Sequence, residues 1–263
     1  MNKLKPLPEE WSGLLNNEQK EAIENINGPL LIIAGAGSGK TRVLTYRYAH
    51  LIKTYGINFE NVLAITFTNK AANEMKDRIS DLLNLELSPK WISTFHSLCV
   101  KMLRIHGHLI GFNNNFTIYD QSDSTKLVRN CMRDSDIDTK QYSPKRIQAH
   151  ISSLKNQRIL PGEAVEFAQS FFDVKVAEIY SSYQKKLMLA NSMDFDDLLI
   201  KAVELLETSD KSLNYWSSKF QYIMIDEYQD TNMVQYRLVE LLASKHKNIC
   251  VVGDSDQSIY AFR

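Results

Sequence analysis

The sequence has no long hydrophobic run, and within its 263 residues no stretch approaches the ~20 apolar residues that a transmembrane helix requires. It also lacks the pattern of a secretory signal peptide, because Pro6, Pro8, Glu9 and Glu10 interrupt the N-terminus. These absences argue against a membrane-spanning or secreted protein. We therefore expect a cytoplasmic location and no membrane partner.

Cysteine is scarce. Cys99, Cys131 and Cys250 are scattered along the chain, and neither they nor the six histidines show the spacing of a metal site. This argues against a disulfide scaffold and a zinc centre, and we expect three packed thiols.

The chain also lacks net charge, since 31 basic residues balance 31 acidic ones. The balance is uneven, because residues 192–263 carry 12 acidic and 7 basic side chains, which leaves the preceding part weakly basic. Such a surface permits binding to nucleic acid without requiring it.

A glycine-rich turn follows an uncharged apolar run, Leu30 to Ala34, and leads into a segment with helical apolar spacing. This order of strand, loop and helix predicts a phosphate-binding loop, in which backbone N–H groups surround phosphates while Lys40 and Thr41 reach phosphate and Mg²⁺. The predicted loop residues are Ala34, Gly35, Ala36, Gly37, Ser38, Gly39, Lys40 and Thr41. Ala34 departs by one methyl group from the strict pattern, which has glycine there.

Two acidic residues, Asp226 and Glu227, follow the apolar segment 222–225. At the tip of a strand, Asp226 is placed to hold Mg²⁺ opposite Thr41, and Glu227 can orient or deprotonate the attacking water. A further strand over 248–252 brings Gln257 to the same edge, where it can sense the terminal phosphate. The sequence therefore predicts nucleotide hydrolysis with ATP and Mg²⁺.

Apolar strand patterns at 61–66 and 91–94 alternate with helical patterns, one of them over 69–83, which is typical of a mostly parallel sheet. From about Thr117 the pattern becomes helical, with helices predicted over 121–134, 143–155, 161–169 and 172–190. We expect an α/β phosphate-loop fold of the RecA-like type, with the sheet flanked by helices. The ATP-binding domain would be discontinuous (1–116 and 192–263), with an all-α subdomain inserted at 117–191.

Gln19 has two interpretations. Asn16 and Gln19 have the spacing of a capping box at the start of a helix, and this local interpretation is favoured. The planar amide of a glutamine just before a phosphate loop can also read the edge of adenine.

Two further residues have structural alternatives. Phe67 precedes Asn69 at the end of a predicted strand, and it fits a core position as well as a base-stacking one. His96, near Thr94 at the start of a helix, is more often a surface or cap-adjacent residue than a DNA contact.

Basic residues of the insertion are predicted to be exposed, and most such charges form only a solvated face. DNA contact is the less favoured interpretation of this set, which comprises Arg146, Lys155, Arg158, Lys185 and Lys186.

Taken together, these segments resemble superfamily 1 DNA helicases of the UvrD, PcrA and Rep type. The similar motifs occur in the family's order over nearly the whole chain: residues 15–19, 34–41, 66–72, 94–97, 194–199, 226–232 and 252–260.

The resemblance implies a role for each matching residue. Gln19 would read adenine, Arg42 would pack near the base, Lys40 and Thr41 would hold phosphate and Mg²⁺, and Glu227 would be the catalytic carboxylate. Gln257 would couple the γ-phosphate to the DNA site. The single-strand track would comprise Phe67, Asn69, Thr94, His96, Tyr260 and Phe262, where Phe262 replaces the tryptophan of many members.

By the same resemblance, the parent protein is an ATP-dependent DNA translocase and helicase that moves 3′ to 5′ on single-stranded DNA and opens duplex DNA at a junction. The insertion would touch the duplex, and partners would be repair or replication proteins. A second motor domain, which supplies arginines to the γ-phosphate, is absent, so we expect the chain to be a fragment with little activity alone. The alternatives are a phosphate-loop kinase or hydrolase without a DNA track, and a non-catalytic interaction fragment.

Overall fold

A computed structural model describes residues 5–85 and 89–254 of the chain. They form two compact units. Unit 1 contains residues up to Leu98, Asp210–Thr231 and the residues from Val239 on, and unit 2 contains Cys99–Ser209 and Asn232–Leu238. Among the described residues, no helix has the length and hydrophobicity needed to cross a bilayer.

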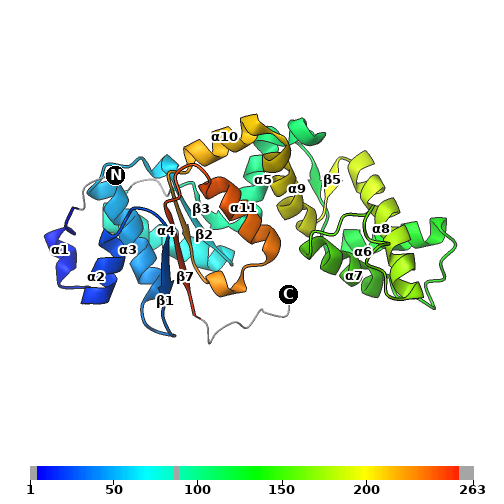
Figure 1. The fold of residues 1–263 in the computed structure, drawn as a ribbon, viewed down its shortest axis with the longest axis horizontal. Coiled ribbons are helices and arrows are strands. Elements are labelled where there is room, and N and C mark those ends of the chain that lie inside the picture. The colour runs from blue at the N-terminus through cyan, green and yellow to red at the C-terminus, as the bar shows by residue number, and fades with distance from the viewer. Residues whose placement is uncertain (1–4, 86–88, 255–263) are drawn as a thin grey trace. The chain divides into compact units, whose positions relative to one another are not determined.

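Unit 1 is built on a five-stranded parallel sheet with the order β1-β7-β6-β2-β3 (Figure 1). Its strands are β1 (Leu30–Ile33), β2 (Val62–Thr66), β3 (Ile92–Thr94), β6 (Tyr222–Ile225) and β7 (Ile249–Gly253). Because all strands run in one direction, their carboxyl ends lie along one edge, where parallel sheets bind ligands. The predicted α/β phosphate-loop fold with a parallel sheet is confirmed.

Helices α3 (Lys40–Lys53) and α4 (Asn69–Leu83) pack against this sheet and against each other. Leu44 and Tyr48 of α3 and Met75 of α4 share a core with alternate strand residues such as Ala64 and Met224. The core follows from the period of two along each strand, which puts every second side chain on the same face.

The strand β1 differs from the buried strand that its uncharged sequence predicts. Within the described sheet it pairs only with β7, and Leu31 and Ile33 are 58% and 67% exposed. The burial prediction was wrong for these two residues, because an apolar run does not show whether a strand lies at the edge of its sheet.

The remaining elements of unit 1 include α2 (Asn17–Glu24), which begins after Asn16 as the capping box predicted. The sequence analysis did not identify α1 (Glu9–Ser12), the 3₁₀ turns η1 (Phe59–Asn61) and η3 (Tyr228–Asp230), or α10 (Asp210–Lys219). The helices α5 (Phe95–His106) and α11 (Met233–Ala243) each contribute residues to both units.

Unit 2 is mainly helical. It contains α6 (Gln121–Asp134), α7 (Pro144–Asn156), α8 (Phe171–Leu189), α9 (Phe195–Thr208), the turn η2 (Gly107–Ile110), and a two-stranded parallel sheet of β4 (Thr117–Ile118) and β5 (Ser192–Met193). Val128, Ile147, Ile151, Val176 and Leu187 lie in its core, where α6, α7 and α8 meet.

The limits of unit 2 are wider than the predicted insertion, 117–191, because α9 packs against α7 and η2. The domain assignment itself stays a prediction. The predicted helix over 161–169 was wrong: Pro161 and Gly162 open a series of turns, in which amides such as Glu166 N bond three residues back.

The three cysteines are free and buried, as predicted.

Candidate nucleotide site

The predicted phosphate loop connects β1 to α3 and has the backbone of a tight turn. Gly37 and Gly39 have φ angles of 74° and 87°, in the left-handed region where a side chain is strained. Ala34 donates its N–H to the carbonyl of Gly253 at 3.1 Å, which fixes the start of the loop to β7. Gly35, Ala36, Gly37 and Ser38 are exposed, so their backbone is accessible to a ligand.

Lys40, the first residue of α3, is buried, with only 9% of its surface exposed. Its ammonium donates to the carbonyls of Ala34 and Gly35 at 3.0 and 3.3 Å and pairs with Asp254 at 3.2 Å. The ammonium of Lys40 is therefore enclosed by the backbone of the loop. It lies at the start of a helix, where anions are favoured.

Thr41 and Asp226 meet across the sheet edge, because the hydroxyl of Thr41 donates to Asp226 Oδ2 at 2.9 Å. Asp226 is 4% exposed, and this burial raises the pKa of its carboxyl group. A hydroxyl and a carboxylate are hard oxygen ligands, and Mg²⁺ in nucleotide sites is held by one or two such groups together with phosphates. The residues present thus fit the predicted Mg²⁺ site.

Glu227 has a positive φ of 51° in the left-handed region. Its carboxylate accepts a hydrogen bond from the Gln229 amide at 2.8 Å, and the Gln229 oxygen accepts from the backbone N–H of Asp254 at 3.0 Å. Gln229 therefore joins the ends of β6 and β7. The sequence analysis did not select Gln229 or Asp254 as site residues, although both lie within the motifs that carried the resemblance.

Gln19 forms the capping box predicted for it. Its N–H donates to the Asn16 side chain at 2.8 Å, and its side-chain oxygen accepts from Asn16 N at 3.1 Å. The other end of the amide donates to the carbonyl of Ser38 in the phosphate loop at 3.1 Å. Arg42 is exposed, with its guanidinium 5.6 Å from the ring centre of Tyr46. The reading of adenine by Gln19 stays a prediction.

Four of the residues predicted to line a DNA track, Phe67, Asn69, Thr94 and His96, lie at the ends of two neighbouring strands, since Thr66 of β2 is in register with Thr94 of β3. Phe67 is half-buried, and its ring packs edge-on against Phe95 with 5.8 Å between the two ring centres. Asn69 is exposed at the start of α4. The structure thus brings these residues to one edge, while their contact with DNA stays a prediction.

Thr94 and His96 are less accessible. Thr94 is 8% exposed, and its hydroxyl oxygen accepts from Ser97 N at 3.3 Å, as in a helix cap. His96 is half-buried, and burial lowers the pKa of its imidazole. Three further predicted site residues, Gln257, Tyr260 and Phe262, lie outside the described residues.

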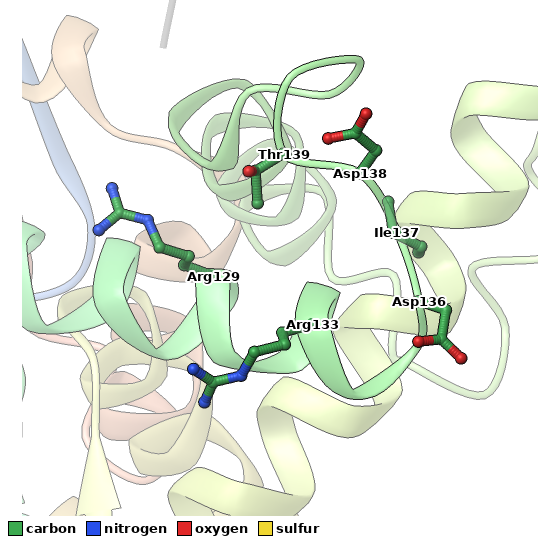
Figure 2. Close-up of a pocket in the computed structure, with 6 residues that line it drawn as sticks. All are labelled: Arg129, Arg133, Asp136, Ile137, Asp138 and Thr139. Carbon is green, nitrogen blue, oxygen red and sulfur yellow. The ribbon is translucent and has the colours of Figure 1, made fainter.

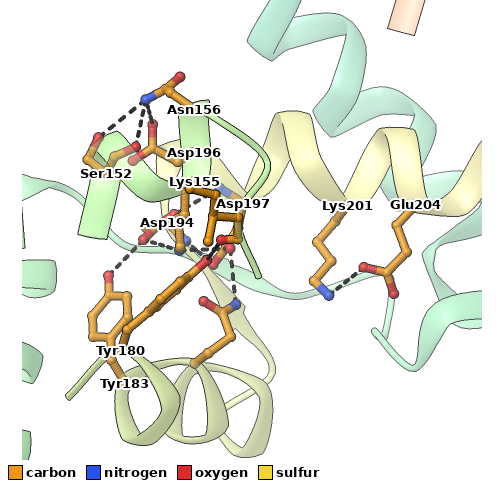
Figure 3. Close-up of polar contacts among 12 residues, drawn as sticks. Ser152, Lys155, Asn156, Tyr180, Tyr183, Asp194, Asp196, Asp197, Lys201 and Glu204 are labelled. Carbon is orange, nitrogen blue, oxygen red and sulfur yellow. Dashed lines mark hydrogen bonds and ion pairs between the residues drawn. The ribbon is translucent and has the colours of Figure 1, made fainter. Parts of the chain in front are cut away.

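The basic residues of unit 2 differ in exposure. Arg146, Arg158 and Lys185 are exposed, as predicted. The prediction was wrong for Lys155, which is 1% exposed and pairs with Asp194 at 2.7 Å and Asp197 at 2.8 Å (Figure 3). The spacing of hydrophobic residues in the sequence did not show whether Lys155 is exposed to solvent or buried in an ion pair.

Two arginines that the sequence analysis did not select lie on α6. Arg129 and Arg133 line a cavity of ≈ 470 Å³ together with residues 136–139 (Figure 2). Both side chains are exposed. This cavity belongs entirely to unit 2.

Comparison with known proteins gives a consistent result. The family model of the UvrD/REP helicase N-terminal domain matches residues 15–263. The chain is 49% identical over 249 residues to the ATP-dependent DNA helicases PcrA of Staphylococcus aureus and Staphylococcus epidermidis. The match covers 95% of this chain and 34% of each relative, so the chain spans about a third of the length of these relatives.

Proposed function

The chain belongs to the UvrD/REP helicase family, because residues 15–263 match the N-terminal domain of that family. From this premise we propose that its parent protein is an ATP-dependent DNA helicase. It would hydrolyse ATP to move along single-stranded DNA in the 3′ to 5′ direction and to open duplex DNA.

The observation that carries this proposal is the convergence of Lys40, Thr41, Asp226 and Glu227 on one sheet edge. These residues come from the ends of β1 and β6, 185 positions apart in the case of Thr41 and Asp226. A buried ammonium, a hydroxyl beside a carboxylate, and a second carboxylate are the groups that phosphoryl transfer to water requires.

Each group has a separate task. The exposed loop amides and Lys40 bind the phosphates and orient the terminal one for attack. Thr41 and Asp226 would hold Mg²⁺, which when bound neutralises charge on the phosphate oxygens. Glu227 accepts the proton of the attacking water, and the hydrogen bond from Gln229 holds its carboxylate in place.

DNA would bind beside this site. Phe67 and Asn69 lie at the end of β2, next to Thr94 and His96 at the end of β3, where an aromatic face can stack a base and polar groups can reach the backbone. Exposed arginines of unit 2, such as Arg129 and Arg133, are suited to contact duplex phosphates. Further groups of the active site, including arginines directed at the γ-phosphate, would come from a second motor domain in the parent protein.

Steady-state ATP hydrolysis by the full-length protein and by this chain, with and without single-stranded DNA, tests the proposal. We expect DNA to stimulate the full-length protein, and we expect this chain to be slower by about 10³-fold or more, the contribution of a transition-state arginine. Glu227→Gln should abolish turnover while retaining nucleotide binding. DNA-independent transfer to a small acceptor would instead indicate a kinase, and complementation by Lys40→Ala and Glu227→Gln would indicate a non-catalytic role.

A further inference from the structure

Arg47 lies in the middle of α3, and at 2% exposure it is among the largest fully buried side chains of the protein. Its Nη1 donates to two backbone carbonyls, those of Ala22 and Asn25, both at 2.6 Å. Within the described ranges no carboxylate forms an ion pair with Arg47. Since burying a charge is costly without compensation, these two carbonyls are its main stabilising partners.

Both carbonyls belong to the C-terminal end of α2. The last carbonyls of a helix have no partners within it and carry partial negative charge, so a buried guanidinium there satisfies both needs. The helix α2 has only eight residues, a length that is marginal in isolation, and it depends on tertiary contacts. The contact with Arg47 therefore anchors one end of α2.

Gln19 lies at the other end of α2. Its amide nitrogen contacts the phosphate loop at Ser38 O, and a Cβ built at Gly39 would lie 2.9 Å from that nitrogen. A side chain at position 39 would therefore force the Gln19 amide to move. A shift of α2 by about 1 Å would break the contact between Gln19 and Ser38, because hydrogen bonds weaken beyond ~3.2 Å. The position of α2 thus determines where the Gln19 amide lies relative to the loop.

The helix α3 carries both the lysine of the phosphate loop and the arginine that holds α2. Lys40 begins α3 at the phosphate loop, and Arg47 follows two turns later, about 10 Å along the axis. One rigid element therefore fixes the phosphate-binding lysine and, through Arg47, the helix that carries the predicted adenine reader.

We propose that Arg47 is a positioning residue for nucleobase selectivity: it holds α2 so that Gln19 meets the base while Lys40 holds the phosphates. The proposal rests on the proposed ATPase activity and on the predicted role of Gln19. Apolar packing of Ile23 against Val43 and Tyr46 is the competing explanation for the position of α2, and it predicts that Arg47 contributes stability alone.

The test measures kcat/KM for ATP and for GTP in the full-length protein, at a temperature where circular dichroism shows every variant folded. Arg47→Lys keeps the charge and loses the planar fork, and Arg47→Met keeps the aliphatic stem. Tyr48→Phe is the matched control, because at the next position of α3 it removes a part-buried hydrogen bond to the carbonyl of Phe59, which lies outside α2. Gln19→Ala reports the base reading itself.

We expect Gln19→Ala and both Arg47 variants to lower the ATP/GTP ratio about three- to tenfold, the range of one lost hydrogen bond, while Tyr48→Phe leaves it unchanged. In the double variant Gln19→Ala/Arg47→Lys, the second substitution should have no further effect on the ratio.

A normal ratio in both Arg47 variants, together with a reduced ratio in Gln19→Ala, would overturn the role of Arg47 alone. A normal ratio in Gln19→Ala would overturn it together with adenine reading by Gln19. An absence of nucleotide hydrolysis by the unsubstituted full-length protein would overturn the proposed function itself, so the three failures are distinguishable.

Discussion

The ammonium of Lys40 lies 3.2 Å from the carboxylate of Asp254, a residue 214 positions later in the chain. Both side chains are buried, at 8% and 4% exposure. The ion pair joins the phosphate loop after β1 to the end of β7, and it places a negative charge beside the group that is expected to bind phosphate.

Replacing Asp254 by Asn should tighten nucleotide binding. The substitution keeps the shape of the side chain and removes a carboxylate that competes with phosphate for Lys40. We expect the Kd for ATP to fall about three- to tenfold. This is less than the full energy of a charge-assisted hydrogen bond, because the carbonyls of Ala34 and Gly35 still accept from Lys40 and compete with phosphate. Equilibrium titration with a fluorescent nucleotide measures it. Asp138→Asn in unit 2 is the control, and weaker binding by Asp254→Asn would contradict the competition.

Replacing Gln229 by Ala should slow catalysis with little change in nucleotide affinity. The side chain holds the Glu227 carboxylate and accepts from Asp254 N, so its loss frees the proposed base and leaves a buried N–H without its partner. We expect kcat to fall about tenfold or more, because misplacing a catalytic group by about 1 Å is costly. Steady-state kinetics of the full-length protein would show this. Gln157→Ala, an exposed glutamine of unit 2, is the control, and a rise in KM alone would count against the assignment.

Replacing Lys155 by Met should destabilise unit 2 strongly. Lys155 pairs with Asp194 and Asp197, and Tyr183 also donates to Asp194 at 2.8 Å (Figure 3). Removing the cation leaves two buried carboxylates facing each other, which typically costs about 3–5 kcal/mol. Denaturant unfolding measures the loss. Lys201→Met removes a more exposed lysine that pairs with Glu204, and it should cost less than about 1 kcal/mol. Equal losses in the two variants would contradict the role of burial.

Replacing Asp196 by Asn should stabilise the protein at neutral pH. Burial, followed by the charge of Asp194, raises the pKa of the Asp196 carboxyl group. Because the pKa is higher in the folded state, the ionised side chain opposes folding at any pH above its pKa in the unfolded state. This opposition decreases as the pH falls and the folded protein binds the proton. The gain from Asp196→Asn should therefore be largest near pH 7 and should disappear in acid.

Urea midpoints of both proteins from pH 7 down to pH 4 would check this pH dependence. A gain that grows toward low pH would reverse the assigned sign.

Much of the site could be predicted from local sequence because its parts are short and regular. Most strands of the main sheet are largely apolar runs. The residues that follow them, Lys40, Asp226 and Asn69 among them, are placed at the carboxyl edge by the parallel arrangement alone. The capping box of Asn16 and Gln19 is likewise local. The helix α11 had the same signal, since Asn232 and Gln235 form a reciprocal cap, but the sequence analysis did not use it.

The amino-acid sequence by itself determined the strands of the parallel sheet, the phosphate loop and the family, because hydrophobic period, glycine placement and ordered motifs are properties of neighbouring residues. The tertiary structure decided which side chains meet across long separations: Lys40 with Asp254, Gln229 between β6 and β7, Arg47 at the end of α2, and Lys155 among buried carboxylates. It also decided that β1 is exposed on one face. Burial and long-range pairing depend on how elements pack, and no local pattern of residues encodes the partner that packing brings into contact.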